Sequence, residues 1–455
     1  MSFLKTRGLH PNHVVIGAFL CVILVGAVLL SLPMAAARER VSVIDALFTA
    51  TSAVCVTGLT VVDTGSVYSL FGQIVTILLI QIGGLGITTF STFFVYVTGG
   101  RMSLRGRGVV ESTLTQHPVR NMGQLLLRIL IVTAVIEGIG AVLLYPSLTP
   151  GVRAGYFPVF TAIFHSVSAF CNAGFSLYST NLGSYVGNPA VSLTICGLII
   201  LGGLGFVVMT ELWEFVFKRR RGLPKRLSLH ARVVLTVTGV LLAAGTLVFL
   251  LLERNNALAG MPLGTKLLAS FFQATTPRTA GFNTVPLGMC ANATLFFIIM
   301  LMFVGASPGS CGGGIKTTSL AVIVGLAMSK LRGNADVNLF RRRVPDGVVS
   351  NAISVAFLAA VMLVLVIMLL SVTETALQEA FPGDDFIALS VEAVSAFGTV
   401  GLSTGITPSL SVPGKLLIII LMMVGRLGPL TITIALAARE LKPRFRYAAE
   451  SVMIG

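Results

Sequence analysis

The sequence predicts an all-α integral membrane protein with eight spanning helices, arranged as four tandem units. The first observation is composition: of 455 residues, 55% are hydrophobic and 11% are charged, with a mean hydropathy of +0.93. Soluble domains carry about 25% charged residues, so a water-soluble fold is excluded. The second observation is the long apolar runs, which favour helices over the alternating pattern of a membrane barrel. The third is an internal repeat.

The remaining composition excludes several other classes. The six cysteines and five histidines are scattered, without CxxC pairs or metal-ligand spacing, so we expect no disulfide, structural metal, organic cofactor or enzyme active site. The net charge of +15 does not indicate nucleic acid, because the basic residues lie between apolar segments. The first apolar segment, residues 14–32, is long enough to span a membrane and is interpreted as a retained helix, with signal cleavage near residues 35–37 as the alternative.

Basic clusters between the apolar segments predict the topology. Five clusters hold 23 of the 32 lysines and arginines. By the positive-inside rule all five are cytoplasmic, which predicts a multi-pass plasma-membrane protein with both termini inside; simple solvation of loop charges would give the same placement. The clusters are Lys5–Arg7, Arg101–Arg128, Lys218–Arg232, Lys330–Arg343 and Arg439–Arg446.

Between consecutive clusters the same pattern recurs: a long apolar segment, a short semi-apolar segment, a polar stretch with a shared glycine, and another long apolar segment. The four predicted units cover residues 1–100, 101–222, 223–335 and 336–455. Four matches in one register indicate tandem copies. The polar stretches read Thr51-Ser-Ala-Val-Cys-Val-Thr-Gly58-Leu, Val167-Ser-Ala-Phe-Cys-Asn-Ala-Gly174-Phe, Thr275-Thr-Pro-Arg-Thr-Ala-Gly281-Phe and Val394-Ser-Ala-Phe-Gly-Thr-Val-Gly401-Leu.

The segment before each shared glycine is too short to span and is predicted to be a re-entrant pore half-helix. These segments are Val43–Val54, Pro158–Phe170, Leu263–Thr276 and Phe386–Phe397. Extended backbone at membrane depth must be buried in protein or line a wet cavity, so four such loops predict one central ion pore. Glycine lets successive carbonyls face an ion, and the negative C-terminal ends of the half-helices favour a cation. The predicted filter carbonyls belong to Val56, Thr57, Gly58, Asn172, Ala173, Gly174, Thr279, Ala280, Gly281, Thr399, Val400 and Gly401.

A second Gly-rich stretch lies inside the apolar segment that follows each filter. Close helix packing is an alternative interpretation for Gly83 or Gly202. The third stretch, residues 305–317, interrupts its helix with small residues, as a movable gate loop beneath the filter would require; a packing kink is the alternative. It is not a phosphate-binding loop, because Ile315 separates the lysine from the preceding glycine. The candidate gate residues are Gly305, Ser307, Gly309, Ser310, Gly312, Gly313, Gly314, Lys316 and Arg426.

Three charged residues, Arg426, Glu137 and Glu392, lie within apolar or semi-apolar segments, where a charge costs at least about 2.5–3.5 kcal/mol. A fourth, Arg278, lies in the polar stretch of the third unit. Arg426 is interpreted as a barrier partner of the gate loop, with a purely structural role as the alternative. Arg278 is predicted to point away from the pore and to bond the scaffold behind the filter. Glu137 and Glu392 are expected to bind backbone donors or an arginine, with an ion site as the alternative.

These motifs resemble the Trk/Ktr/HKT superfamily of potassium transporters, and within it the Ktr-type membrane subunit, over nearly the whole chain. The resemblance implies K⁺ uptake through a gated pore, with K⁺ at the filter residues and Na⁺ as a frequent activator. It also implies a homodimer in the lipid bilayer and a cytoplasmic RCK-type nucleotide-binding regulatory ring. The chain begins directly at the first unit, as in the Ktr branch. The most specific motifs are Val54-Cys-Val-Thr-Gly-Leu59, Arg278-Thr-Ala-Gly-Phe-Asn283, Ser395-Ala-Phe-Gly-Thr-Val-Gly-Leu402, residues 305–317 and Gly425-Arg-Leu-Gly-Pro429.

Two other transport mechanisms stay open. A Na⁺-conducting or poorly selective pore of the same fold is one; relatives of that type carry serine in place of the first filter glycine, which here is Gly58. An alternating-access secondary carrier is the other, and it would show paired broken spanning helices and midplane charges. The four-fold repeat favours the pore.

Overall fold

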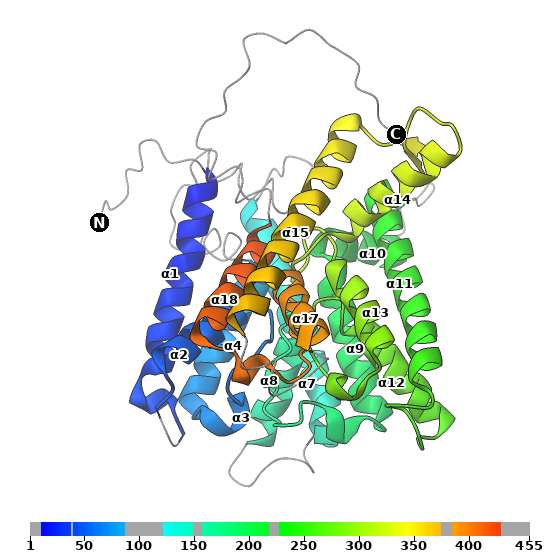
Figure 1. Ribbon diagram of the computed structural model, residues 1–455. Helices are drawn as coiled ribbons and strands as arrows, with labels where there is room; N and C mark the ends of the chain where they lie inside the picture. Colours follow the sequence, from blue (N-terminus) through cyan, green and yellow to red (C-terminus); the bar gives the residue numbers. More distant parts are fainter. Residues whose placement is uncertain are drawn as a thin grey trace.

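The computed structural model describes residues 11–37, 40–86, 122–148, 157–217, 227–374 and 385–428, and these are mostly helical (Figure 1). Most of the predicted basic clusters, and with them both termini, lie outside the described residues. So do the ends of the first, second and fourth predicted units. The cluster Lys330–Arg343 is described, and it forms a feature that the sequence did not predict, a short hairpin of β1 Asn338–Leu339 and β2 Arg342–Arg343.

The described helices form four successive groups with a common order: a first helix, a short helix, an extended segment and a second helix. Two further helices, α10 Phe206–Phe217 and α14 Thr317–Leu331, follow the second helices of groups two and three. Short helical turns lie in the connections: η1 Pro33–Ala35, α3 Thr64–Val67, η3 Gly183–Tyr185, η4 Leu287–Met289 and η5 Thr407–Ser409. The groups are α1 Pro11–Ser31, α2 Val43–Val54 and α4 Leu70–Leu85; α7 Met122–Leu148, α8 Pro158–Phe170 and α9 Pro189–Leu204; α11 Leu229–Glu253, α12 Leu263–Thr275 and α13 Asn292–Phe303; α15 Asp346–Thr373, α17 Asp385–Gly398 and α18 Val412–Leu427.

The short helices agree closely with the predicted half-helices. Helices α2 and α8 have the predicted bounds, α12 ends one residue earlier, and α17 extends one residue further at each end. Local signals explain their starts: the Ser42 side chain caps α2 by accepting from Asp45 N (3.1 Å), and Pro158 occupies the first position of α8.

Three of the four second helices end directly before a glycine. Gly86, Gly205 and Gly428 follow α4, α9 and α18 with φ of 85°, 90° and 87°. Such angles stop a helix and are readily adopted only by glycine. After Gly205 the chain turns by 104° into α10. In group three α13 ends at Phe303, and the helix resumes as α14.

Three described helices are long and apolar enough to cross a membrane, Leu127–Leu148, Leu229–Glu253 and Asp346–Thr373, or four if the bent α9–α10 pair counts as one span. The other apolar helices are shorter, among them α4 and α18, which end at the glycines just described. Eight crossings therefore stay a prediction.

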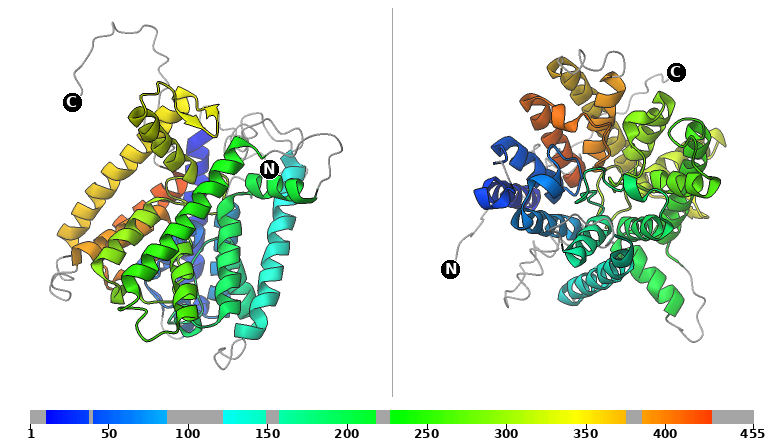
Figure 2. Two further views of the ribbon diagram at one scale, coloured as in Figure 1. Left: turned by 90° about the vertical axis from the view of Figure 1, so that its right-hand side faces the viewer. Right: turned by 90° about the horizontal axis from the view of Figure 1, so that it is seen from below.

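Each group packs on the next in a cyclic order. The second helix of one group contacts the short helix of the following group: α4 with α8, α9 with α12, α13 with α17, and α18 with α2. Two large buried apolar clusters result, one mainly in groups one and two and the other mainly in groups three and four. Seen from below, the helices surround a central region of extended segments (Figure 2).

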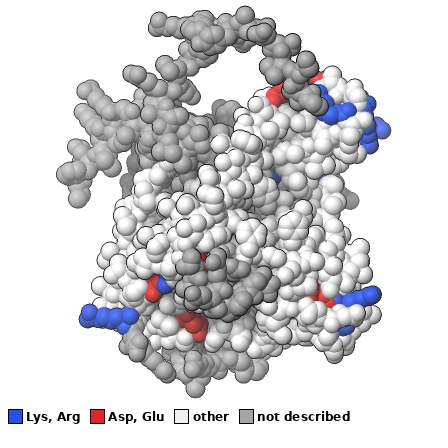
Figure 3. All heavy atoms as spheres, viewed as in Figure 1, with Lys and Arg blue, Asp and Glu red and all other residues white. Residues whose placement is uncertain are grey.

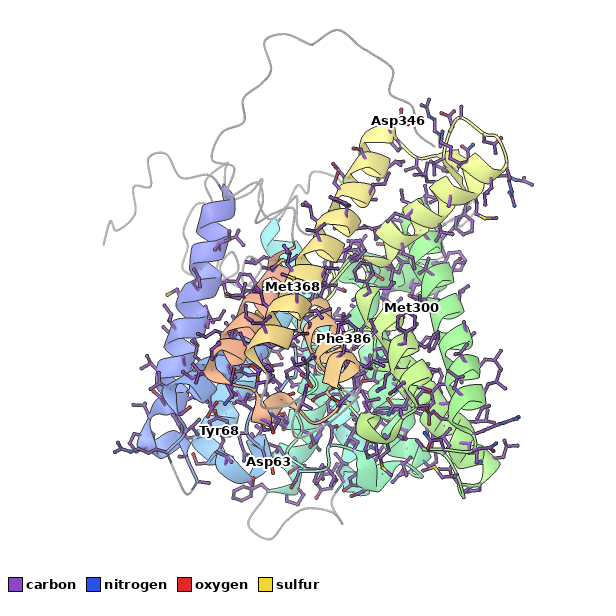
Figure 4. All side chains as sticks on the ribbon, viewed as in Figure 1. Asp63, Tyr68, Met300, Asp346, Met368 and Phe386 are labelled. Carbon is purple, nitrogen blue, oxygen red and sulfur yellow. The ribbon has the colours of Figure 1, made fainter. Side chains whose placement is uncertain are left out.

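The visible face of the molecule is largely uncharged between two edges that carry charged side chains (Figure 3). In Figure 3 the broad middle of the visible face is mostly uncharged, with lysines and arginines at its upper and lower margins. Figure 4 places Asp346 at the upper end of α15 and Asp63 near the lower end of the molecule. Between them lie the exposed side chains of Met300 and Met368. This belt suits contact with lipid.

Candidate functional site

The chain leaves each short helix in an unusual backbone conformation. We call residues 55–59, 171–175, 278–282 and 398–402 the candidate filter segments. In each, the shared glycine and the residue two positions before it both have positive φ. The values are 56° at Val56 and 94° at Gly58, 60° at Asn172 and 70° at Gly174, 68° at Thr279 and 74° at Gly281, and 50° at Thr399 and 88° at Gly401.

The positive φ at the earlier position was not predicted, because valine, threonine and asparagine there gave no signal. For a β-branched residue such a conformation is an outlier, and it persists only where the surroundings enforce it. Here two similar pairs of bonds enforce it. Thr57 N and Gly58 N donate to the carbonyl and hydroxyl of Ser52 (2.7 and 3.1 Å), and Val400 N and Gly401 N donate likewise to Ser395.

The other two segments are held in a related way. Ala173 N donates to the carbonyl of Ser168 (2.7 Å), whose hydroxyl donates to Phe175 O (2.8 Å). In the third segment Ala280 N donates to the carbonyl of Thr276 (3.0 Å). These bonds tie each segment back to the short helix that precedes it. The recurrent Ser/Thr in the repeated stretches was the available sequence signal.

The four segments meet in a closed ring. A Cβ on Gly58 would lie 2.5 Å from Ala173 O, one on Gly174 2.8 Å from Ala280 O, and one on Gly281 2.5 Å from Val400 O. A Cβ on Gly401 would overlap Thr57 O, which closes the ring to the first segment. Glycine is required at these positions both by φ and by the close approach of the next segment.

The second Gly-rich stretches bring the second helices against the ends of the short helices. A Cβ on Gly83, Gly202 or Gly425 would overlap the carbonyl of the last short-helix residues Val54, Phe170 and Phe397, respectively. The packing interpretation of Gly83 and Gly202 is therefore confirmed, and it extends to Gly425.

Residues 305–316, which we call the gate loop, are bonded to both neighbouring second helices; α14 begins at Thr317, the last residue of the predicted loop. Within the loop, Gly305 N donates to Ile315 O (2.8 Å). Toward α9, Ser307 N and Cys311 N donate to Gly203 O and Gly202 O (3.1 and 3.2 Å). Toward α18, Gly314 N donates to Gly425 O (3.3 Å).

Two cationic side chains bond the gate loop. The Arg426 guanidinium donates to Cys311 O in the loop and to Gly83 O in α4. The Lys316 ammonium donates to Gly312 O (2.8 Å). The predicted contact between Arg426 and the loop is confirmed, and Gly83 is a partner that the sequence could not indicate.

Arg278 behaves as predicted. It is buried behind the filter segment, and its Nη2 donates to Thr238 Oγ1 in α11 (3.1 Å). Glu137 and Glu392 were expected to bind backbone donors or an arginine. Among the described residues, side chains bind Glu137 instead, whereas Glu392 accepts from the backbone amide of Thr404 as expected and also from side chains. Gln81 Nε2 donates to Glu137 (3.3 Å). The hydroxyls of Ser403 and Thr407 donate to Glu392.

Two buried carboxylates that sequence reasoning missed join the end of the first helix to the start of the second helix in groups three and four. Glu253, the last residue of α11, accepts from Ala291 N (2.9 Å), directly before α13. Glu374, directly after α15, accepts from Ser411 N (2.9 Å), directly before α18. A carboxylate at a helix N-terminus satisfies free amides and complements the helix dipole. Glu253 and Glu374 occupy matching positions at the ends of α11 and α15. The sequence could have indicated their role only if it were known that α11 pairs with α13 and α15 with α18.

A ring of extended loops behind short helices, with a Gly-rich loop below it, defines a cation-transport class of membrane protein, and the comparisons agree. Residues 10–444 match the family model "TrkH: Cation transport protein", so the chain belongs to this family. The Trk/Ktr resemblance of the motifs is thereby confirmed.

The chain is similar over its length to named transport proteins. It is 41% identical to "Ktr system potassium uptake protein B" of Bacillus subtilis (strain 168), covering 98% of this chain and 96% of that one. Identity to the protein of the same name in Vibrio alginolyticus is 40%, covering 99% and 96%. Identity to "Potassium/sodium uptake protein NtpJ" of Enterococcus hirae is 37%, covering 100% of both. The crystal structure of the potassium transporter TrkH from Vibrio parahaemolyticus shares the fold, with a TM-score of 0.69 at 20% identity over 96% of this chain and 86% of that one.

Proposed function

We propose that the protein takes up K⁺ across the plasma membrane through a channel-like pore formed by four tandem units. The observation that carries this proposal is the closed ring, in which each shared glycine abuts the carbonyl of the next filter segment. Carbonyls of the twelve predicted filter residues replace the hydration shell of the ion. The full-length similarity to potassium uptake proteins supports K⁺ as the cargo.

The gate loop closes the pore on the cytoplasmic side of the filter in this proposal, and Arg426 holds it there. The support is the set of bonds that tie the loop to α9, α18 and Arg426. The loop backbone is rich in glycine, so an alternative arrangement is conformationally accessible.

A homodimer, stimulation by Na⁺ and control by a cytoplasmic RCK-type nucleotide-binding ring are further parts of the proposal. Arg341, Arg342 and Arg343 support a cytoplasmic acidic partner, because they are exposed on the hairpin beyond α14. Conduction of both K⁺ and Na⁺ is a second candidate, favoured by the similarity to a protein named for both ions.

Uptake of ⁸⁶Rb⁺ into proteoliposomes tests the proposal. We expect uptake that follows the imposed membrane potential and that external K⁺ suppresses far more effectively than Na⁺. Equal suppression by both ions would support the second candidate. Absence of uptake by well-folded protein, with and without the regulatory ring, would contradict the pore.

A further inference from the structure

The positive-φ residue at the start of each filter segment faces the gate loop or a part that holds it. We call Val56, Asn172, Thr279 and Thr399 the gate-side residues. Thr399 makes the most direct bond: its Oγ1 accepts from Gly313 N in the gate loop (3.0 Å). Thr279 is packed so closely on Gly312 that a Cβ there would overlap its hydroxyl.

The other two gate-side residues reach the gate loop indirectly, Asn172 through Gly202 and Val56 through Gly83 and Arg426. Val56 lies against Gly83, whose carbonyl accepts from Arg426. Asn172 lies against Gly202, whose carbonyl accepts from Cys311 N (3.2 Å). All four filter segments therefore contact the gate loop or its anchors through the same position, although the chemistry differs from unit to unit.

The position is also where the backbone is strained. Thr399 is fully buried with a φ of 50°, a conformation that threonine adopts only under constraint. The bonds of Val400 N and Gly401 N to Ser395 hold this segment from behind. The bond from Gly313 holds it from the loop side, and this bond exists only while the gate loop lies beneath the filter.

We propose that Thr399 is a positioning residue that couples the ion filter to the gate loop. When the loop leaves, Thr399 loses its partner and its filter segment relaxes, so that the ion preference of the pore depends on the state of the gate. Because coupling is reciprocal, removing the hydroxyl also destabilises the closed loop. This inference rests on the proposed function, since it assumes that the segments conduct the ion.

Thr399→Val tests the coupling, because it removes the hydroxyl at nearly constant shape. The substitution fits the backbone, since Val56 occupies the equivalent position with a φ of 56°. A neutral hydrogen bond stabilises by about 0.5–1.5 kcal/mol, so we expect ⁸⁶Rb⁺ flux to rise about two- to ten-fold. In the same variant, the extent to which external Na⁺ suppresses ⁸⁶Rb⁺ flux should also change. Thr399→Ser keeps the hydroxyl, so its flux and its Na⁺ competition should lie closer to wild type than those of Thr399→Val.

Testing Thr399→Val in a gate-loop deletion variant distinguishes loss of the Thr399–Gly313 bond from a general destabilisation of the filter. In a variant lacking Ser310–Gly313, the partner amide is gone, so Thr399→Val should change flux no further. An equal fold-change in both backgrounds would overturn the proposal, as would valine-like behaviour of Thr399→Ser. The matched control is Thr133→Val in α7, whose buried hydroxyl has no partner among the described residues; its flux should be unchanged.

Gly313→Ala gives an independent answer if Thr399→Val does not fold. The added Cβ would lie 2.5 Å from Thr399 Oγ1 and 2.8 Å from its Cγ2, so we expect raised flux. Combining it with Thr399→Ala removes both clashing atoms and should lower flux again. A double variant with flux at or above that of Gly313→Ala would refute the coupling. Wild-type protein without Rb⁺ flux would instead refute the proposed function.

Discussion

The Lys415 ammonium lies 2.7 Å from the Asp45 carboxylate and joins the first turn of α18 to the first turn of α2. Groups four and one meet here, at the point where the cyclic packing closes. Both side chains are mostly buried, with 14% and 20% of their surface exposed. Asp45 also bonds the Ser42 hydroxyl that caps α2 (2.8 Å). One carboxylate thus serves a helix cap and the contact between two distant parts of the chain.

Removing that carboxylate should destabilise the protein more than removing the ammonium. Exposed pairs contribute up to about 1 kcal/mol, and breaking a buried pair costs about 3–5 kcal/mol. For Asp45→Ala we expect a loss of about 1–3 kcal/mol, and for Lys415→Met a smaller loss, because methionine still covers the site. Thermal unfolding in detergent compares the Tm of the two variants, and Asp45→Ala should have the lower Tm. A lower Tm for Lys415→Met would contradict the dual role of Asp45.

Side chains at the shared glycines should alter ion preference. Gly58→Ser adds a Cβ at a φ of 94°, within 2.5 Å of Ala173 O, so we expect K⁺ to lose about ten-fold or more of its advantage over Na⁺, equivalent to about 1.4 kcal/mol. Flux competition between K⁺ and Na⁺ measures this. Gly239→Ser is the control, because a Cβ at Gly239 in α11 would meet nothing within 4 Å. Unchanged competition in Gly58→Ser would place the filter elsewhere.

Loss of the Arg426 bonds should open the gate. Hydrogen bonds from charged groups contribute about 1.5–3 kcal/mol, so Arg426→Ala should raise ⁸⁶Rb⁺ flux about ten-fold or more from a low closed-state level. The flux should also depend less on the regulatory ring. The K⁺/Na⁺ preference should change only through the relaxation of the filter that follows release of the gate loop. Arg332→Ala, at an exposed position after α14, serves as the control. Reduced or unchanged flux in folded Arg426→Ala would make the loop a packing feature.

The helix-capping carboxylates should matter for stability and not for conduction. Glu253 accepts from Ala291 N, Ala257 N and the Asn256 amide (2.9, 3.2 and 2.8 Å). Glu253→Ala leaves these donors without their acceptor, which costs about 1–3 kcal/mol, so Tm should fall. Glu253→Gln keeps one acceptor oxygen and should lose less. Flux per folded molecule should match wild type in both, and a changed K⁺/Na⁺ preference would contradict a structural role.

The sequence predicted the short helices well because local signals define them. Their shortness, their semi-apolar character and the shared glycine after each of them gave their positions within one residue. It also identified Gly58 and its three counterparts, because a glycine that recurs directly after every half-helix indicates a backbone conformation that other residues disfavour. The direction of Arg278 followed from comparison of the units.

Only the tertiary structure decided how these parts meet. The second helices end at Gly86, Gly205 and Gly428, and hydropathy cannot show this because a glycine inside an apolar run can continue a helix or stop it. Gly83, a partner of Arg426, and Ala291, a partner of Glu253, lie far from them along the chain, so their proximity depends on how the helices pack. The positive φ of Thr399 was likewise hidden, because threonine disfavours that conformation and accepts it only when bonds from Ser395 and Gly313 converge on its segment. Local chemistry therefore determined the elements of this protein, and long-range hydrogen bonds and close glycine contacts determined the arrangement in which they face a common axis.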